Sequence, residues 1–438
     1  MRVAFFTLGC KVNQYETSAL EQQFSENGFI VVSPDAFAEV YVVNSCTVTA
    51  QGDQKSRRML RRFRRQNPAA VVVLCGCFPQ AFPEKAEGIP EADIVAGSTQ
   101  RSRLLELVRE RLAPGGPGER MVRIIPHESG EPFEPLRVNA FSAHTRAFLK
   151  IQDGCRRRCA YCIIPTARGP VRSKAPADLA AELRELAAAG YREVVLVGIN
   201  LSCYGADFGG TLLDAVTLAC GTPGIIRVRL GSLEPELLNR EDIEAMARLP
   251  QLCPQFHLSL QSGCDATLNR MRRQYDTERY RALVSQLRSA FPGCAITTDL
   301  MVGFPGETEE EFQESLAFAR EIAFAKAHVF AYSPRGGTPA AGMPHQVDEG
   351  EKARRSRLMS AALEEDRLAC FRSQVGLVRE VLLERGVTDG KREGYTPQYV
   401  PVAVPATGTA AGDVLRVSIT GTGPGGCMGV PLNRPPGD

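Results

Sequence analysis

Three cysteines stand in one short stretch of this sequence, at a spacing that suits a metal cluster. Cys155, Cys159 and Cys162 follow a C-x3-C-x2-C pattern directly after an expected strand. One turn of backbone can wrap a cluster at this spacing and aim all three sulfurs inward. Structural zinc normally takes four closed ligands, and iron–sulfur clusters normally take four cysteines. Because a fourth local cysteine is missing, a cluster here would keep one iron open for a substrate or cofactor.

A second set of three cysteines is scattered along the first part of the chain. Cys10 follows the first expected strand, Cys46 ends the second and Cys77 follows the third. In an open parallel sheet, ligands bind in the crevice beyond the carboxyl ends of the strands, so these thiols are expected to converge there. Cys75 competes with Cys77 for this position. We prefer Cys77 because it lies in a Gly-containing turn, whereas Cys75 ends an apolar run.

A run of arginines forms a third candidate site. Residues 55–65 carry seven cations and no acid. At helical spacing, five arginines fall along one stripe while apolar residues face the sheet, and such a stripe suits a phosphate backbone. A solvated helix face is the other interpretation. The five candidate RNA-binding residues are Arg57, Arg58, Arg61, Arg62 and Arg65.

More arginines lie in and just after the cysteine loop, namely Arg156–Arg158, Arg168 and Arg172. They would either hold a polyanion at the open iron or only offset the negative charge of a thiolate-bound cluster. The whole chain has a net charge of only +2, which by itself argues against a strongly nucleic-acid-binding protein. Any attraction for nucleic acid must therefore come from such local concentrations.

The elements that position the N-terminal cysteines alternate between strands and helices. Their β-α-β-α-β order predicts a doubly wound parallel sheet in a domain over residues 1–113. The Pro- and Gly-rich segment Ala113–Arg120 marks a break, and we place a linker at residues 114–139. The expected strands are Arg2–Leu8, Val40–Asn44 and Ala70–Cys75, and the expected helices are Tyr15–Asn27 and Gln54–Gln66.

The middle of the chain repeats this alternation. Six expected strands with helical patterns between them predict a partial (β/α) barrel over residues 140–371, with its active face at the carboxyl ends of the strands. Residues 372–438 hold short β-rich runs between Gly, Thr and Pro, which predict a small antiparallel barrel. The six strands are Ala147–Gln152, Val194–Gly198, Ile226–Leu230, Gln255–Leu260, Ala295–Val302 and Ala327–Tyr332.

Composition narrows the class of protein. The 438 residues are too many for one ordinary core, and 44% hydrophobic with 23% charged residues excludes wholesale disorder. Neither a membrane-length apolar run nor a signal peptide is visible, so we expect a cytoplasmic protein without membrane association. Disulfides are rare in that compartment, so the fourteen cysteines are expected to be buried or bound to metal. Those outside the two triads are expected to pack as small hydrophobes.

Together these motifs resemble the radical S-adenosylmethionine (SAM) methylthiotransferase family, of the MiaB/MtaB type. Tyr161, the aromatic before the last cysteine of the loop, matches the radical SAM signature. The segment TLGCKVNQYE at Thr7–Glu16 is similar to the amino-terminal signature of the family, as are Asn44–Thr49 and Gly76–Cys77. The tail resembles the small TRAM β-barrel. The similarity covers nearly the whole chain.

The resemblance implies two [4Fe–4S] clusters and SAM as cofactors. Cys155, Cys159 and Cys162 would hold the catalytic cluster that cleaves SAM to a radical. Cys10, Cys46 and Cys77 would hold an auxiliary cluster that carries the sulfur to be inserted, and a second SAM would supply the methyl group. The residues implied in cofactor binding are Tyr161, Gly198, Asn200, Glu234 and Gln261.

The Thr7–Glu16 segment most resembles the MtaB-type branch of the family. This implies methylthio insertion at carbon 2 of N6-threonylcarbamoyladenosine at position 37 of tRNA. The implied partners are the tRNA anticodon stem-loop, a reduced flavodoxin- or ferredoxin-like electron donor, and a sulfur donor. One alternative is the same chemistry on N6-isopentenyladenosine or on an aspartate of a ribosomal protein. The other is a non-enzymatic iron–sulfur or zinc RNA-binding protein.

Overall fold

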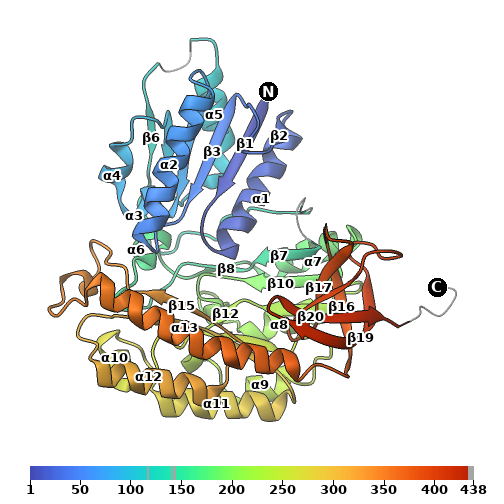
Figure 1. The fold of residues 1–438 in the computed structure, drawn as a ribbon. Helices are drawn as coiled ribbons and strands as arrows, with labels where there is room; N and C mark the ends of the chain where they lie inside the picture. Colours follow the sequence, from blue (N-terminus) through green and yellow to red (C-terminus); the bar gives the residue numbers. More distant parts are fainter. Residues whose placement is uncertain (116–117, 140, 142–144, 433–438) are drawn as a thin grey trace.

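The computed structural model describes residues 1–115, 118–139, 141 and 145–432 (Figure 1). It has an N-terminal parallel sheet, a larger barrel-like sheet beneath it, and a small closed barrel at the side. This arrangement confirms the α/β class with a C-terminal β-barrel. Ala140, the expected start of the middle domain, and residues 433–438 of the expected tail lie outside the described residues.

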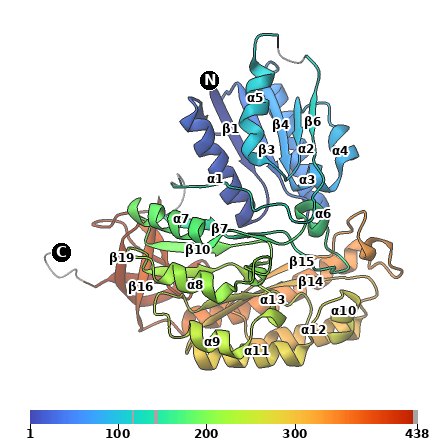
Figure 2. The same ribbon diagram turned by 180° about the vertical axis from the view of Figure 1, so that it is seen from behind.

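The N-terminal region is a sheet of six parallel strands in the order β2-β1-β3-β4-β5-β6. Side chains alternate across it, so that Val42 packs towards α1 and α5 while Tyr41 and Val43 pack towards α2. Figure 2 shows α5 on the face opposite to α2. The elements are β1 (Arg2–Thr7), α1 (Lys11–Glu26), β2 (Ile30–Val32), β3 (Val40–Ser45), α2 (Ala50–Gln66), β4 (Val71–Gly76), α3 (Cys77–Ala81), α4 (Pro83–Glu87), β5 (Ile94–Ala96), α5 (Leu104–Leu112) and β6 (Met121–Arg123).

The sequence analysis does not predict three strands of this sheet, namely β5 and the two edge strands β2 and β6. Each has only three residues, too few to show a periodic pattern. β6 lies inside the segment expected to be a linker, and Ile94 of β5 pairs with Met121 of β6. The first sheet therefore extends beyond Ala113 to Arg123, and the Pro- and Gly-rich segment falls between α5 and β6 in the sequence.

The barrel-like sheet has six parallel positions. β12 continues β11 after Gly231, so that β11 pairs with β10 and β12 pairs with β13. The expected partial (β/α) barrel is therefore confirmed. Its elements are β7 (Arg146–Lys150), β8 (Gln152–Asp153), α6 (Ile164–Arg168), β9 (Arg172–Ser173), α7 (Pro176–Ala188), β10 (Glu193–Val197), α8 (Leu212–Cys220), β11 (Arg227–Leu230), β12 (Ser232–Leu233), α9 (Arg240–Met246), β13 (Gln255–Leu258), α10 (Asp265–Arg270), α11 (Thr277–Ala290), β14 (Ala295–Val302), α12 (Glu309–Ile322), β15 (Lys326–Ala331) and α13 (Glu349–Arg372).

The tail forms a closed barrel in the order β16-β17-β18-β20-β19. The expectation of a purely antiparallel barrel is wrong in one place, because β18 and β20 pair in parallel. This barrel is fixed to the larger one by Arg229, whose Nη1 donates to the carbonyl of Pro397 at 2.8 Å. Its strands are β16 (Val378–Thr388), β17 (Lys391–Tyr395), β18 (Pro401–Pro405), β19 (Val414–Gly423) and β20 (Gly426–Pro431).

Candidate active site

The carboxyl ends of β1 and β3 point towards β7 and β8 of the larger barrel (Figure 1). In the N-terminal sheet the strand order reverses between β1 and β3. Such a reversal opens a crevice at the carboxyl edge of a doubly wound sheet, where ligands bind. Cys10 follows β1 and Cys46 follows β3. The topology therefore places both thiols at this crevice.

Cys10, Cys46 and Cys77 converge there. The sulfurs of Cys10 and Cys77 each lie 4.0 Å from Oδ1 of Asn13. Gly9 has a φ of +103°, and a Cβ added to it would lie 2.9 Å from the sulfur of Cys46. Cys46 therefore packs directly against the turn that carries Cys10. Burial raises the pKa of the Cys46 thiol to about 12, so its thiolate form needs a positive partner such as iron.

Cys75 and Cys77 have different surroundings. Cys75 packs with Val71 and Val73 in the core beneath α1 and α5. Cys77 begins α3, and its sulfur accepts a hydrogen bond from Nε of Arg168 at 3.2 Å. These placements favour Cys77 over Cys75 as a metal ligand.

The barrel triad lies in the loop between β8 and α6. The sulfur of Cys155 is 3.7 Å from Nδ2 of Asn200, and the sulfur of Cys159 accepts from Nη1 of Arg273 at 3.3 Å. Burial raises the pKa of Cys162 to about 12, and the neighbouring Cys159 and Cys155 add to this effect. The three sulfurs are thus close enough to repel one another as thiolates, which a cluster would relieve.

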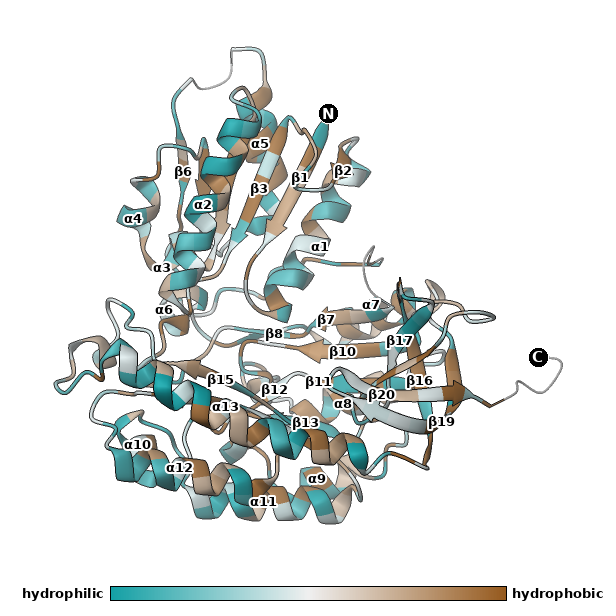
Figure 3. Ribbon diagram, in the orientation of Figure 1, coloured by the Kyte–Doolittle hydropathy of each residue, from teal (hydrophilic) through white to brown (hydrophobic). Residues whose placement is uncertain are grey.

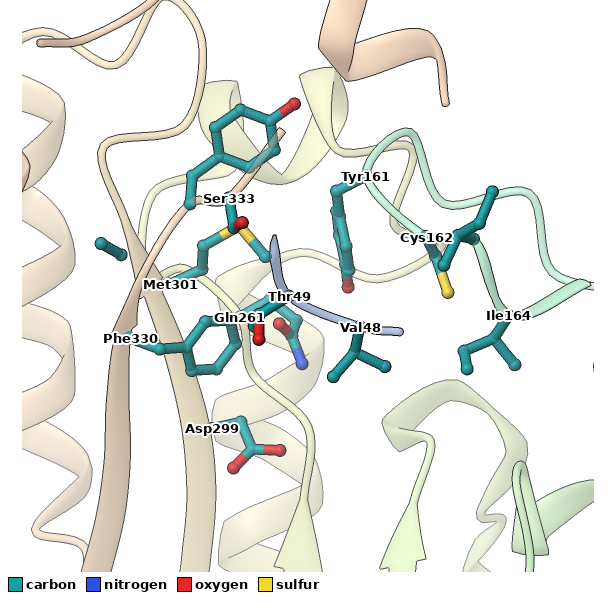
Figure 4. Close-up of a pocket in the computed structure, with 13 residues that line it drawn as sticks. Val48, Thr49, Tyr161, Cys162, Ile164, Gln261, Asp299, Met301, Phe330 and Ser333 are labelled. Carbon is teal, nitrogen blue, oxygen red and sulfur yellow. The ribbon is translucent and has the colours of Figure 1, made fainter. Parts of the chain in front are cut away.

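A cavity of about 390 Å³ opens beside this triad and is called the Cys162 cavity below. Figure 4 shows Tyr161 and Cys162 on one side of it and Met301 and Phe330 on the other. Gln261 also lines it, with a backbone φ of +67°. The Gln261 Oε1 atom is buried and has no hydrogen-bond partner among the described residues. Because unpaired buried acceptors are rare, this oxygen is well placed to accept from a ligand.

The other residues expected to bind SAM have distinct positions. A Cβ added to Gly198 would lie 2.8 Å from Oε1 of Gln152, so only glycine lets that amide approach. The same oxygen accepts from the backbone N–H of Asn200 at 2.7 Å, while the buried Asn200 Oδ1 atom has no hydrogen-bond partner in the part of the chain that the structure describes. Glu234 pairs with Arg273, the donor to Cys159. Glu234 therefore lies one contact behind Cys159, on the far side of that arginine.

The donor sets fit iron–sulfur clusters. Within the described ranges, no three His, Cys, Asp or Glu side chains gather tightly enough for a single metal ion. A four-iron cluster spaces its cysteine sulfurs more widely than one ion does, which suits two open triads of thiols. The unpaired oxygens of Asn200 and Gln261 beside the barrel triad fit the amino group of SAM.

A buried ionic network, which the sequence analysis missed, joins the N-terminal cysteines to the barrel elements on either side of the barrel triad. Glu16 on α1 lies 2.7 Å from Nζ of Lys150, 2.5 Å from Nη1 of Arg168 and 3.3 Å from Nη2 of Arg101. Burial raises the pKa of Glu16, but the three cations outweigh it and bring the pKa down to about 2. Arg168 is fully buried and also contacts Cys77. The network therefore ties β7 and α6 of the barrel to α1 and Cys77 of the N-terminal region.

One signal in the sequence could have revealed that Glu16 needs a buried cationic partner, although not which residue supplies it. Glu16 falls on the same helical face as Val12, Tyr15 and Ala19, and all four are buried. A carboxylate on a buried face needs a cationic partner. Of the two interpretations of Arg168 and Arg172, burial excludes contact with a polyanion, because Arg168 pairs with Glu16 and Arg172 with Glu131.

The arginine stripe lies on the outer side of α2, which is mostly teal in Figure 3, while Leu60 and Phe63 face the sheet. Its charge is partly compensated, because Arg61 pairs with Glu91 and Arg62 with Asp35. These acids lie outside the run, so the sequence around the arginines does not reveal them. Arg57 lies over the ring of Phe78. The remaining two, Arg58 and Arg65, are exposed and have no ion-pair partner within the described part of the chain.

A (β/α) barrel with an open cysteine triad, joined to a doubly wound domain with a second triad, defines a radical SAM enzyme with an additional cluster site. Comparisons agree with this class. Residues 149–319 match the radical SAM superfamily, and residues 2–97 match an uncharacterized protein family designated UPF0004. The chain belongs to the MiaB/MtaB-type family of radical SAM methylthiotransferases, which are enzymes that use SAM and [4Fe–4S] clusters.

Individual relatives cover nearly the whole chain. The threonylcarbamoyladenosine tRNA methylthiotransferase MtaB of Bacillus subtilis is 39% identical over 96% of this chain and 94% of its own. The tRNA-2-methylthio-N(6)-dimethylallyladenosine synthase of Acidothermus cellulolyticus is 36% identical over 95% of this chain and 85% of its own. The radical SAM methyltransferase TsrM of Kitasatospora setae shares the fold, with a TM-score of 0.55 at 17% identity over 78% of this chain and 77% of its own.

Proposed function

We propose that this enzyme inserts a methylthio group at carbon 2 of N6-threonylcarbamoyladenosine at position 37 of tRNA. The observation that carries the proposal is the 39% identity to the Bacillus subtilis relative over 96% of the chain. Two cysteine triads, each with one member that lines a cavity, supply the two centres that this chemistry needs. The corresponding dimethylallyladenosine enzymes are also similar, so the substrate is the point that needs a direct test.

The site residues divide into two groups under this proposal. Cys155, Cys159 and Cys162 hold the cluster that binds SAM, and Cys10, Cys46 and Cys77 hold the auxiliary cluster. When bound, the clusters and SAM supply the radical that removes the adenine hydrogen and the sulfur and methyl group that replace it.

The neighbouring side chains orient and shield SAM. Gln261 and Asn200 orient it by accepting hydrogen bonds from its amino group. Tyr161 and Val48 line the Cys162 cavity and exclude water from its contents. Arg273 donates to Cys159, and so stabilises the thiolate that the cluster requires.

The proposal also includes partners and location. The tRNA anticodon stem-loop is the substrate, a reduced flavodoxin- or ferredoxin-like protein supplies electrons, and a sulfur donor renews the auxiliary cluster. Within the described ranges no helix combines the length and apolar character needed to cross a membrane. We place the enzyme in the cytoplasm because its proposed substrate is tRNA.

Nucleoside analysis tests the substrate directly. A strain that lacks its own methylthiotransferases is complemented with this gene, and nucleosides from its tRNA are measured by mass spectrometry. We expect the 2-methylthio form of N6-threonylcarbamoyladenosine to appear. Appearance of only 2-methylthio-N6-isopentenyladenosine would overturn the substrate assignment, and no methylthio product at all would overturn the reaction.

The exposed arginines of α2 give a second test. The double variant Arg58→Gln with Arg65→Gln should weaken binding to an anticodon stem-loop. It should also make the slope of log K against log salt concentration shallower by about one unit per lost phosphate contact. Fluorescence anisotropy at several salt concentrations measures both. Arg103→Gln with Arg109→Gln, at α5 on the opposite face of the sheet, is the matched control and should change neither. Equal effects of the two double variants would mean that the α2 arginines contribute only to the overall positive charge of the protein and do not contact the RNA.

A further inference from the structure

A second cavity, of about 280 Å³, meets the Cys162 cavity at Asp299, which lines both. All three regions of the chain contribute to it. Cys10 and Lys11 come from the N-terminal region, Lys326 from the larger barrel and Tyr399 from the small barrel. We call it the Cys10 cavity. It lies beside Cys10 of the auxiliary triad and shares Asp299 with the cavity at the radical SAM site.

The polarity of the interior changes between the two cavities. Alternate residues of a strand face the same side, and β14 and β15 each contribute residues to both spaces. β15 gives Lys326 and His328 to the Cys10 cavity and Phe330 to the Cys162 cavity. β14 gives Thr297 to the Cys10 cavity and Met301 to the Cys162 cavity. The interior therefore changes along the same strands from polar and cationic to apolar.

The Cys10 cavity has an excess of positive charge. Lys11 and Lys326 are exposed to it, and neither makes an ion pair with a carboxylate of the described residues. Among the described residues that line it, the single carboxylate is Asp299, and its Oδ2 lies 3.3 Å from Nε2 of His257. Partial burial lowers the pKa of His328, and the charges of Lys326 and Lys11 add to this shift. Crowded ammonium groups without counter-charges are the features of a receptor for an anion.

Lys11 has the most direct position in this receptor. It follows Cys10 in the chain and is the first residue of α1, a helix of 16 residues. The backbone N–H groups of a helix N-terminus also favour negative charge. An anionic group bound by Lys11 would therefore lie next to the auxiliary cluster site.

The two candidate substituents on the adenine differ in charge. Carbon 2 of the adenine has to lie between the auxiliary site at Cys10 and the SAM site at Cys162. The N6 substituent of the same ring can therefore reach the Cys10 cavity. A threonylcarbamoyl group carries a carboxylate and a hydroxyl, whereas an isopentenyl group is wholly apolar. An apolar group placed against unpaired ammonium groups removes their bound water and offers no hydrogen bond in its place, which is unfavourable.

We propose that the Cys10 cavity binds the carboxylate of the threonylcarbamoyl group and that Lys11 is the residue that selects this group over an apolar one. The inference rests on the proposed function, since it assigns a part of that substrate to a part of the site. Lys326 supplies a second charge. A phosphate of the RNA backbone has the same kind of charge, so the test must separate the two sources.

The test measures binding rather than turnover. Full-length protein with both clusters reconstituted is titrated into three anticodon stem-loops that differ only at position 37, which carries threonylcarbamoyladenosine, isopentenyladenosine or adenosine. Fluorescence anisotropy gives each dissociation constant. We expect the wild type to prefer the threonylcarbamoyl RNA over the adenosine RNA by about 10- to 100-fold, as for one charge-assisted hydrogen bond.

Lys11→Met should abolish this preference, leave the affinity for the adenosine RNA within about twofold, and improve binding of the isopentenyl RNA. Lys11→Arg should keep the preference. Lys85→Met, at an exposed lysine on α4 away from the cavity, is the matched control and should leave all three affinities unchanged. Iron content of each variant shows that both clusters are still bound.

Two results would overturn the inference. Equal weakening for all three RNAs would mean that Lys11 contacts a backbone phosphate, and a retained preference in Lys11→Met would mean that another group reads the carboxylate. Either result alongside restored 2-methylthio-N6-threonylcarbamoyladenosine in the complemented strain would refute only the role of Lys11. Failure of that complementation would refute the proposed function itself.

Discussion

Glu16→Gln should destabilise the protein by about 3–5 kcal/mol, as expected when one partner of a buried charge network is removed. Glu16 is fully buried and contacts Lys150, Arg168 and Arg101. Glutamine keeps the shape of the side chain but leaves three buried cations without their shared carboxylate. Urea unfolding of the cluster-free protein measures the loss as a lower midpoint.

The pH dependence of stability gives the same experiment a second readout. The folded pKa of Glu16 is lowered to about 2, whereas an unfolded glutamate titrates near pH ~4.3. The stabilisation is therefore present above the unfolded pKa and is lost as pH falls towards 2. Glu16→Gln should remove this part of the acid sensitivity.

Glu26→Gln is the matched control, because it makes the same substitution at an exposed position of the same helix. It should change stability by less than about 0.5 kcal/mol. If Glu16→Gln were as mild as Glu26→Gln, the network would not contribute to joining the two regions.

Cys77→Ala should lower the iron content of the reconstituted protein from about eight to about four per chain, since each cubane cluster holds four irons. The sulfur of Cys77 lies 4.0 Å from Oδ1 of Asn13, as does that of Cys10, so its loss leaves the auxiliary cluster with two ligands. The barrel triad keeps its three cysteines. Cleavage of SAM to 5′-deoxyadenosine should therefore continue while methylthio insertion stops.

Cys75→Ala is the control for this experiment. Its sulfur packs among Val71 and Val73, so its removal should leave a small cavity in the core and the full iron content. Loss of four irons in Cys75→Ala but not in Cys77→Ala would mean that Cys75 is the third ligand of the auxiliary cluster and that Cys77 is not. About four irons in the unaltered protein would refute the presence of two clusters.

The order of strands and helices could be predicted from the sequence because apolar runs such as Val71–Leu74 are continuous and buried on both faces. The convergence of Cys10 and Cys46 followed from topology alone, since parallel strands end at one edge. The barrel loop was predictable because its three cysteines are local. Three-residue strands such as β2 give no pattern and were missed.

Contacts between distant segments could not be predicted. Nothing around Arg168 in the sequence indicates Glu16 as its partner, because the two are brought together only when the N-terminal region packs on the barrel. In the same way, Asp35 and Glu91 reach Arg62 and Arg61 from separate loops. Tyr399 of the small barrel lines the Cys10 cavity, and no local sequence motif predicts this position.

The network around Glu16 also bears on how the enzyme matures. Glu16 shares its three cations with two further carboxylates. Asp153 pairs with Lys150 and Arg168, and Glu134 pairs with Arg101, so the buried charges compensate one another without any iron. The N-terminal region and the barrel can therefore dock while both cysteine triads are still empty.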